Sequence, residues 1–179
     1  MNLLKFIKYV LKARAIICLI LMFIIVTAIF YQRGGLASDS MDSRITKIVY
    51  QAHAFVLENN CDLSIAQKAF ETDPRFIDNQ KMIYIFMHSY DTVRKEVICI
   101  AQGARPELVG KNMWSLRTPE GRLIFQESIT LLKGKEEFWL EYDWLNPYTN
   151  LVKTKRAFYK KIVLSDGRKA WVGSGYWKN

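Results

Sequence analysis

The chain has 179 residues and a formal net charge of +9. Five cationic residues and no acidic one precede Asp39, so the rest of the chain carries only +4, which does not favour nucleic-acid binding. About 145 residues follow the first apolar segment, enough for one domain with a core but too few for a kinase or transmitter module beside it.

An uncharged, mostly apolar segment covers residues 15–31. Its length lies at the short end of the roughly 17–25 residues that cross a bilayer as a helix. Lys and Arg favour the cytoplasmic side, so the basic flank predicts a cytoplasmic tail at 1–14, a single transmembrane anchor at 15–32 and an extracytoplasmic remainder. The small residues Gly35-Leu36-Ala37-Ser38 leave a cleaved secretory signal as the alternative, which exports the same domain.

The cysteine and histidine residues give little indication of a metal-binding or cofactor site. Beyond the anchor, Cys61 and Cys99 either form a disulfide or remain two buried thiols. His53 and His88 are the only histidines, and no Cys-x-x-Cys or His-x-x-x-His spacing occurs. The sequence therefore predicts no metal site and no cofactor.

Residues 33–42 are typical of a polar linker that ends in a helix cap. Apolar residues at three- and four-residue steps then predict a long helix that ends near Asn59-Asn60; they are Ile45, Ile48, Val49, Ala52, Phe55 and Val56. Asp62 is typical of the cap of a second, shorter helix. Asp73-Pro74 should end that helix, because proline disfavours helix in the residue before it.

Short segments rich in aromatic and β-branched residues predict strands, and polar turn signals separate them. The expected elements are, in order, strands at 82–88 and 96–101, a helix at 121–132, and strands at 137–144, 152–162 and 170–177. The first two strands should form a hairpin around the polar turn 90–95, and residues 102–120 should be irregular. This order predicts an α+β domain with a mostly antiparallel sheet.

Six segments are arranged as in a known family: Asp73–Phe76, Tyr84–Phe86, Pro106–Asn112, Tyr142–Pro147, Lys155 and Val172–Tyr176. Together they resemble the single Cache domain of bacterial extracytoplasmic sensors, over residues 43–178. The resemblance implies a long helix packed on a PAS-like antiparallel sheet of five or six strands, with a small ligand in the concave face. It also implies a periplasmic domain on the bacterial inner membrane and a homodimer formed through the anchor and the long helix.

The chain departs from the family pattern at three points. Residues 90–95 contain no glycine where relatives have a glycine-bearing turn, Gln102 replaces a frequent histidine, and Phe158 replaces a frequent tyrosine. Each exchange changes a hydrogen-bonding group or the turn chemistry. The ligand should therefore differ from that of relatives or be absent.

Strand alternation places Phe138, Leu140, Tyr142 and Trp144 on one face of strand 137–144. Tyr142 and Trp144 there provide O–H and N–H donors on an apolar wall, which is typical of a pocket for a small polar molecule. The alternative is that these aromatic side chains only fill the core. Tyr84 and His88 share one face of the first strand and are expected to complete the pocket.

Lys155 shares a strand face with Ala157 and Tyr159, and a lysine that points into a half-buried concavity needs an anion. We expect it to bind a ligand carboxylate, a role that the resemblance also implies. The alternative is a solvated lysine in the basic run 153–161. Arg75 is a second candidate anion clamp, through its bidentate guanidinium group.

The leading hypothesis is a membrane-anchored extracytoplasmic module that senses a small organic anion, such as a short carboxylate, and signals through a partner protein, because 14 cytoplasmic residues leave no room for an output domain. The second hypothesis is a ligand-free docking protein of the cell envelope with the same fold. Catalysis is not expected, because no nucleophile, base and orienting residue group together in the sequence.

Overall fold

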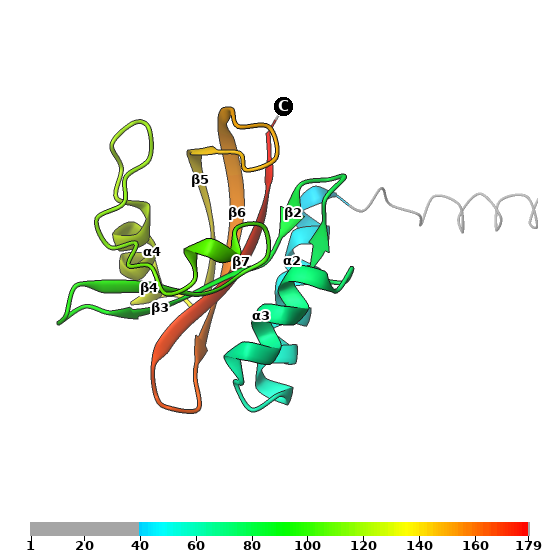
Figure 1. The fold of residues 1–179 in the computed structure, drawn as a ribbon. Coiled ribbons are helices and arrows are strands. Elements are labelled where there is room, and N and C mark those ends of the chain that lie inside the picture. The colour runs from blue at the N-terminus through cyan, green and yellow to red at the C-terminus, as the bar shows by residue number, and fades with distance from the viewer. Residues whose placement is uncertain (1–39, 179) are drawn as a thin grey trace, which may run out of the picture. The chain divides into compact units, whose positions relative to one another are not determined.

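The computed structural model describes residues 40–178 (Figure 1). Its elements are α2 (Met41–Glu58), α3 (Leu63–Thr72), β1 (Ile77–Asp78), β2 (Ile83–Tyr84), β3 (Phe86–Asp91), β4 (Glu96–Gln102), the 3-10 helix η1 (Pro106–Leu108), α4 (Ile124–Leu132), β5 (Glu137–Leu145), β6 (Val152–Val163) and β7 (Lys169–Trp177). No helix within residues 40–178 is long and apolar enough to cross a bilayer. The predicted tail at 1–14, the anchor at 15–32 and most of the linker lie outside the described residues.

The central feature of the fold is a five-stranded sheet in the order β4-β3-β7-β6-β5. Every neighbouring pair of strands is antiparallel. The prediction of an α+β domain with a long helix and an antiparallel sheet of five or six strands is therefore confirmed, with five strands.

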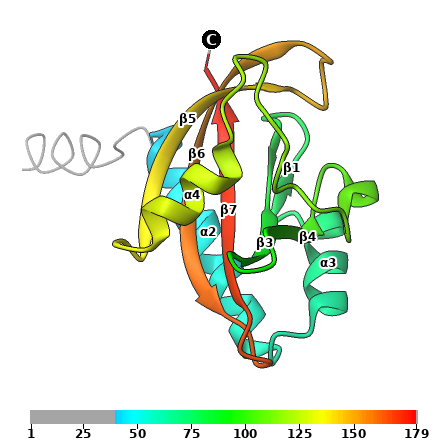
Figure 2. The same cartoon turned by 90° about the vertical axis from the view of Figure 1, so that its left-hand side faces the viewer.

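Each face of the sheet has its own core, because alternate side chains of a strand point to opposite faces. Helices α2 and α3 cover one face, the α2 face, where Phe158 and Val172 are buried (Figures 1 and 2). Helix α4 lies on the other side, the α4 face, where Tyr159 and Trp171 are buried. Cys61 and Cys99 are free thiols that belong to the α2-face and α4-face cores, respectively, so the disulfide is not formed.

The two helices of the α2 face follow the sequence pattern. The apolar stripe of α2 buries Ile45, Ile48, Val49, Ala52 and Val56. The Asp62 carboxylate caps α3 by accepting hydrogen bonds from the backbone N–H groups of Ser64 and Ile65, at 2.9 and 3.2 Å. The packing of both helices thus comes from the spacing and caps that the sequence contains.

Two element boundaries differ from the sequence prediction. The expected strand at 82–88 is divided, because Tyr84 and Ile83 pair with β1 in a separate two-stranded ribbon and β3 begins only at Phe86. Strands of two residues carry too little pattern to be predicted. Helix α4 begins at Ile124, because Gly121 has a φ of +87° and closes a turn onto the Thr118 carbonyl.

The turn between β3 and β4 forms without glycine. Lys95 adopts a φ of +57°, a conformation in which glycine costs less. The Asp91 carboxylate accepts hydrogen bonds from the N–H groups of Val93 and Arg94 and stabilises the turn. The β3–β4 hairpin therefore forms although its turn lacks the glycine of the family pattern.

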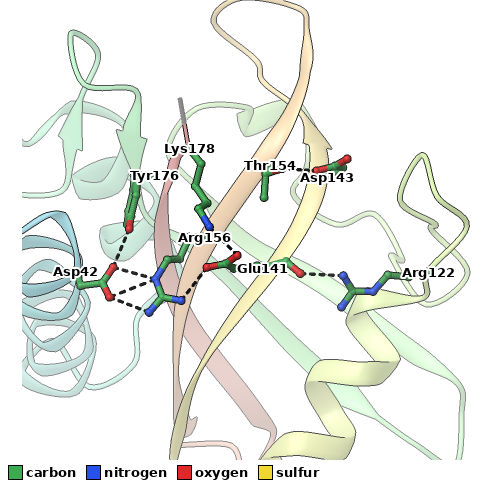
Figure 3. A network of polar contacts seen from close by, with 8 residues as sticks. All are labelled: Asp42, Arg122, Glu141, Asp143, Thr154, Arg156, Tyr176 and Lys178. Carbon is green, nitrogen blue, oxygen red and sulfur yellow. Dashed lines mark hydrogen bonds and ion pairs between the residues drawn. The ribbon is translucent and has the colours of Figure 1, made fainter.

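A polar network fixes the first turn of α2 to the sheet (Figure 3). The Arg156 guanidinium donates to Asp42 in bidentate fashion, at 3.0 and 2.8 Å, and to Glu141 at 2.9 Å. Tyr176 donates its hydroxyl to Asp42 at 2.9 Å, and Lys178 pairs with Glu141 at 3.0 Å. The hydrogen bonds from Arg156 hold the pKa of Asp42 below its ordinary value. The start of α2 is thus tied to β5, β6 and β7.

Replacing Asp62 should show how much the cap of α3 stabilises the domain. We expect Asp62→Ala to lower the free energy of unfolding by about 1 kcal/mol, because two backbone N–H groups lose their acceptor. Chemical denaturation followed by circular dichroism measures this loss. Asp62→Asn keeps an acceptor oxygen and should remain within about 0.5 kcal/mol of wild type; equal losses in both variants would contradict the capping role.

Candidate functional site

A small cavity lies between the α4 face of the sheet and the segment that contains η1 and α4. Its volume is about 50 Å³. The wall consists of Tyr84, Phe86, His88, Gln102, Leu108, Met113, Leu116, Ile124, Phe125, Tyr142, Trp144, Lys155 and Tyr159. Mostly aromatic and aliphatic side chains with a few polar groups are typical of a pocket for a small molecule.

Lys155 is the only charged side chain of this wall. Its side chain belongs to the most deeply buried large groups of the domain, with an exposure of 2% for the residue. The ammonium Nζ donates a hydrogen bond to the Tyr84 hydroxyl at 2.9 Å. It also lies 4.2, 4.9 and 5.3 Å from the ring centroids of Tyr84, Phe86 and Trp177, as in a cation–π contact.

The positive charge of Lys155 has no negative partner within residues 40–178. Burial disfavours the charged form and lowers the pKa of Lys155 from its ordinary value of 10.5 to about 7. Aromatic rings and one hydroxyl offset only part of the cost of removing an ammonium group from water. An anion in the cavity would stabilise the charged form.

Two tyrosine hydroxyls provide hydrogen-bond donors beside this cation. Burial raises the pKa of Tyr84 and of Tyr142, so both hydroxyls keep their protons at neutral pH. Tyr84 accepts from Lys155, and Tyr142 accepts from the Tyr159 hydroxyl at 3.1 Å. Each hydroxyl therefore has its own O–H available as a donor.

His88 adds an unsatisfied polar group to the wall. It is 5% exposed and packs against the rings of Phe86, Phe125 and Trp171. Burial, assisted by the charge of Lys155, lowers the pKa of His88 to about 3, so the imidazole is neutral. Among the described residues, its Nδ1 atom finds no hydrogen-bond partner, and neither does Oε1 of Gln102.

Five of the six predicted site residues meet at this one cavity: Tyr84, His88, Tyr142, Trp144 and Lys155. The expected face alternation along β2 and β3, β5 and β6 brings them together. The alternative of a solvated Lys155 is excluded by its burial.

Arg75 lies elsewhere, which corrects the expectation that it clamps the same ligand. Its guanidinium forms a bidentate pair with Asp73, with a shortest distance of 2.6 Å, and the side chain is 58% exposed. It stacks on Phe55 and Phe76 of the α2-face core. The turn after α3 holds Arg75 locally, because Asp73 is only two residues away.

Some wall residues were not assigned to the site from sequence. Tyr159 shares a strand face with Lys155, so strand alternation is sufficient to predict that it lies in the same wall. The sequence singles out Gln102 only as a departure from the family pattern. Met113 and Phe125 come from the segment that covers the sheet, and no local pattern indicates how such a segment folds back.

A larger hollow of about 790 Å³ lies at the β3–β4 turn, the β6–β7 turn and the end of α4. It contains none of the predicted site residues. Two ion pairs, Asp91–Arg94 and Asp166–Arg168, lie along it at the surface. The smaller cavity is the better candidate for a ligand site, because of these two hollows it is the one with a buried charge that has no ionic partner among the described residues.

The chain belongs to the Cache domain family. The family model described as "Cache domain" matches residues 37–164, and the expected membership is confirmed. A search of curated proteins finds no significant match.

Three solved structures share the fold. A periplasmic sensor domain of a chemotaxis protein is 18% identical, with a TM-score of 0.55 over 84% of this chain and 98% of its own. A methyl-accepting chemotaxis protein from Vibrio parahaemolyticus is 15% identical, with a TM-score of 0.60 over 83% and 95%. A Cache chemosensory domain that recognises carboxylic acids is 15% identical, with a TM-score of 0.55 over 86% and 98%.

The lowered pKa of Lys155 predicts a characteristic pH dependence of stability. Between about pH 7 and the ordinary lysine value of 10.5, the unfolded chain keeps a proton that the folded chain has released. The free energy of unfolding should therefore rise with pH in this window, by up to about 1.4 kcal/mol per pH unit from this group.

Lys155→Met retains most of the apolar stem and removes the titrating group. Urea denaturation at pH 7, 8, 9 and 10 should show a smaller rise in this variant than in wild type. Lys153→Met, at an exposed position of the same strand, should keep the wild-type slope. Identical slopes for wild type and Lys155→Met would show that Lys155 does not titrate in this range.

Proposed function

We propose that this protein is an extracytoplasmic sensor module that binds a small organic anion, such as a short carboxylate, in the cavity under α4. The observation that supports this most strongly is the buried ammonium of Lys155, whose hydrogen-bond partner among the described residues is a neutral hydroxyl. A carboxylate in contact with Nζ would supply the missing negative charge and raise the pKa of the lysine.

The polar groups of the wall suit a carboxylate. The hydroxyls of Tyr84 and Tyr142 can each donate to a carboxylate oxygen while Lys155 provides the charge. Trp144, which packs edge-on against Tyr142 at 5.9 Å, provides apolar surface for a short carbon chain. The ligand is thus expected to carry one carboxylate and a small apolar group.

The cavity volume limits the size of this ligand. One ordered water needs about 10–15 Å³ of such space, so about 50 Å³ accommodates roughly three to five non-hydrogen atoms. Acetate and propionate are in this range, and citrate exceeds it. The carboxylic-acid recognition described for one structural relative supports the same class of ligand.

The proposal includes attachment to the bacterial inner membrane through residues 15–32, with the described domain on the periplasmic side. It rests on the apolar segment and its basic flank. Signalling would then proceed by contact with a partner protein or a second copy of the chain. Exposed residues of α2 at alternating steps of three and four support a paired helix; they are Lys47, Tyr50, Ala54 and Leu57.

Acetate should stabilise the full-length protein. At a concentration 100 times the Kd, linkage predicts about 2.7 kcal/mol of added stability, or roughly 8–10 °C in Tm for a domain of this size. Thermal-shift assays with acetate, propionate and citrate at pH 6.5 measure the effect. Acetate and propionate should raise the Tm, and citrate should not.

The dependence of binding on Lys155 and on pH distinguishes a specific site from a general salt effect. Acetate affinity should fall by up to tenfold per pH unit above about pH 7, as free Lys155 loses its proton. Lys155→Met should abolish the Tm shift, and Lys153→Met should retain it. If no small carboxylate, amine or amino acid shifts the Tm of wild type, the ligand-free docking function is favoured instead.

A further inference from the structure

The residues that flank the polar turn 146–150 of the β5–β6 hairpin, here called the tip, are exposed and apolar. Leu145 and Val152 stand directly opposite each other at the last register position of the two strands, and Leu151 precedes Val152. These three side chains are 40%, 51% and 59% exposed. The turn itself is polar, as is usual for a hairpin, so the exposed aliphatic cluster is confined to the residues on either side of it.

The other cross-strand pairs on this face show how unusual the tip is. One step inward, Thr154 donates its hydroxyl to Asp143 at 2.6 Å. Two steps inward, Arg156 pairs with Glu141 at 2.9 Å (Figure 3). The side chains on this face therefore change from charged to polar to apolar toward the turn 146–150. Val152 lies four residue steps from Arg156, so the tip extends about 13 Å beyond the Arg156 network.

This network also marks the place where the chain enters the domain. Asp42, the second residue of α2, binds Arg156, and Tyr176 near the end of β7 binds the same carboxylate. Figures 1 and 2 show the start of α2 and the β5–β6 turn toward the same end of the domain. Because the ion pairs hold α2 against the sheet, the hairpin tip keeps a fixed position relative to Met41.

The distance from the predicted anchor is short. Residues 33–40 span at most about 28 Å when fully extended. This length allows the tip, about 13 Å from the Arg156 network, to reach the bilayer surface. The argument rests on the proposed anchoring of the protein through residues 15–32.

Cationic side chains lie beside the apolar tip. Lys153 is exposed and follows Val152 directly. Lys178 lies alongside the hairpin, since its backbone N–H donates to the Thr154 carbonyl at 2.9 Å, and its side chain is 47% exposed. The ammonium group of Lys178 pairs with Glu141 at 3.0 Å, so Lys153 is the cation available beside the aliphatic side chains. This combination suits a lipid surface, where the apolar groups contact acyl chains and an ammonium group contacts phosphates.

We propose that the tip of the β5–β6 hairpin inserts its three aliphatic side chains into the interface of the bilayer that anchors the chain. The contact would set the orientation of the domain on the membrane. Since β6 also carries Lys155, the strand that forms the ligand site would be held at the lipid surface at its first residue.

Spin labels at the two ends of β6 test this. Val152 and Val163 are the first and last residues of the strand and have nearly equal exposure, 51% and 54%. Val152→Cys and Val163→Cys are made separately in full-length protein carrying Cys18→Ser and Cys61→Ser, with the buried Cys99 retained. Each nitroxide-labelled protein is reconstituted into phosphatidylethanolamine–phosphatidylglycerol vesicles, and membrane association is measured by flotation.

Accessibility to oxygen, which concentrates in lipid, is then compared with accessibility to a water-soluble nickel chelate. We expect a several-fold higher oxygen-to-nickel ratio at position 152 than at position 163. Equal ratios in vesicles that float would overturn the contact while leaving the anchor intact. If position 152 is protected from the nickel chelate only in native membranes that contain other proteins, the lipid contact is overturned and a protein partner is favoured.

Failure of the protein to float would overturn both the anchor and the lipid contact. The ligand site is tested separately, because the acetate-induced Tm shift is measured in detergent without vesicles. A loss of that shift alongside a lipid-exposed position 152 would overturn the ligand and keep the membrane contact.

Discussion

The ammonium group of Lys155 lies among the rings of Tyr84, Phe86 and Trp177, and a charge in such a position is costly unless an anion joins it. Three features of the α4 face bear on this energetic cost. The Tyr84 and Tyr142 hydroxyls each keep an O–H available as a donor, the nearby imidazole is neutral, and the described chain brings no carboxylate to the cation. This arrangement supports the proposal that a ligand supplies the negative charge.

Two adjacent residues of β6 place their positive charges on opposite faces of the sheet, in different surroundings. Lys155 points to the α4 face, where its charge is unpaired, and Arg156 points to the α2 face, where Asp42 and Glu141 neutralise it. The pairs of Arg156 are partly exposed, so each adds little stability, but together they fix the geometry of α2 against the strands. The candidate ligand site and the first turn of α2 are consequently connected by a single strand, β6.

The fold alone does not define the ligand. Structural relatives at 15–18% identity share the architecture, while the side chains at the cavity decide what is bound. Gln102 stands where the family resemblance implies a histidine, and among the described residues neither its Oε1 nor Nδ1 of His88, another residue of the cavity wall, has a hydrogen-bond partner. The wall thus keeps polar groups at a position where the family pattern is broken, and the small volume supports the proposal of a short ligand.

The sequence by itself determined the helices, the later strands and the face that each side chain takes, because hydrophobic periodicity reports which side of an element is buried. Lys155 and Tyr142 could be assigned to one wall in this way. Only the tertiary structure decided that Tyr84, 71 residues earlier, hydrogen-bonds to Lys155, that Phe125 lines the cavity, and that Arg75 turns back to Asp73. Local patterns contain no information on which strands become neighbours or how a covering loop folds, since those choices are made by long-range packing.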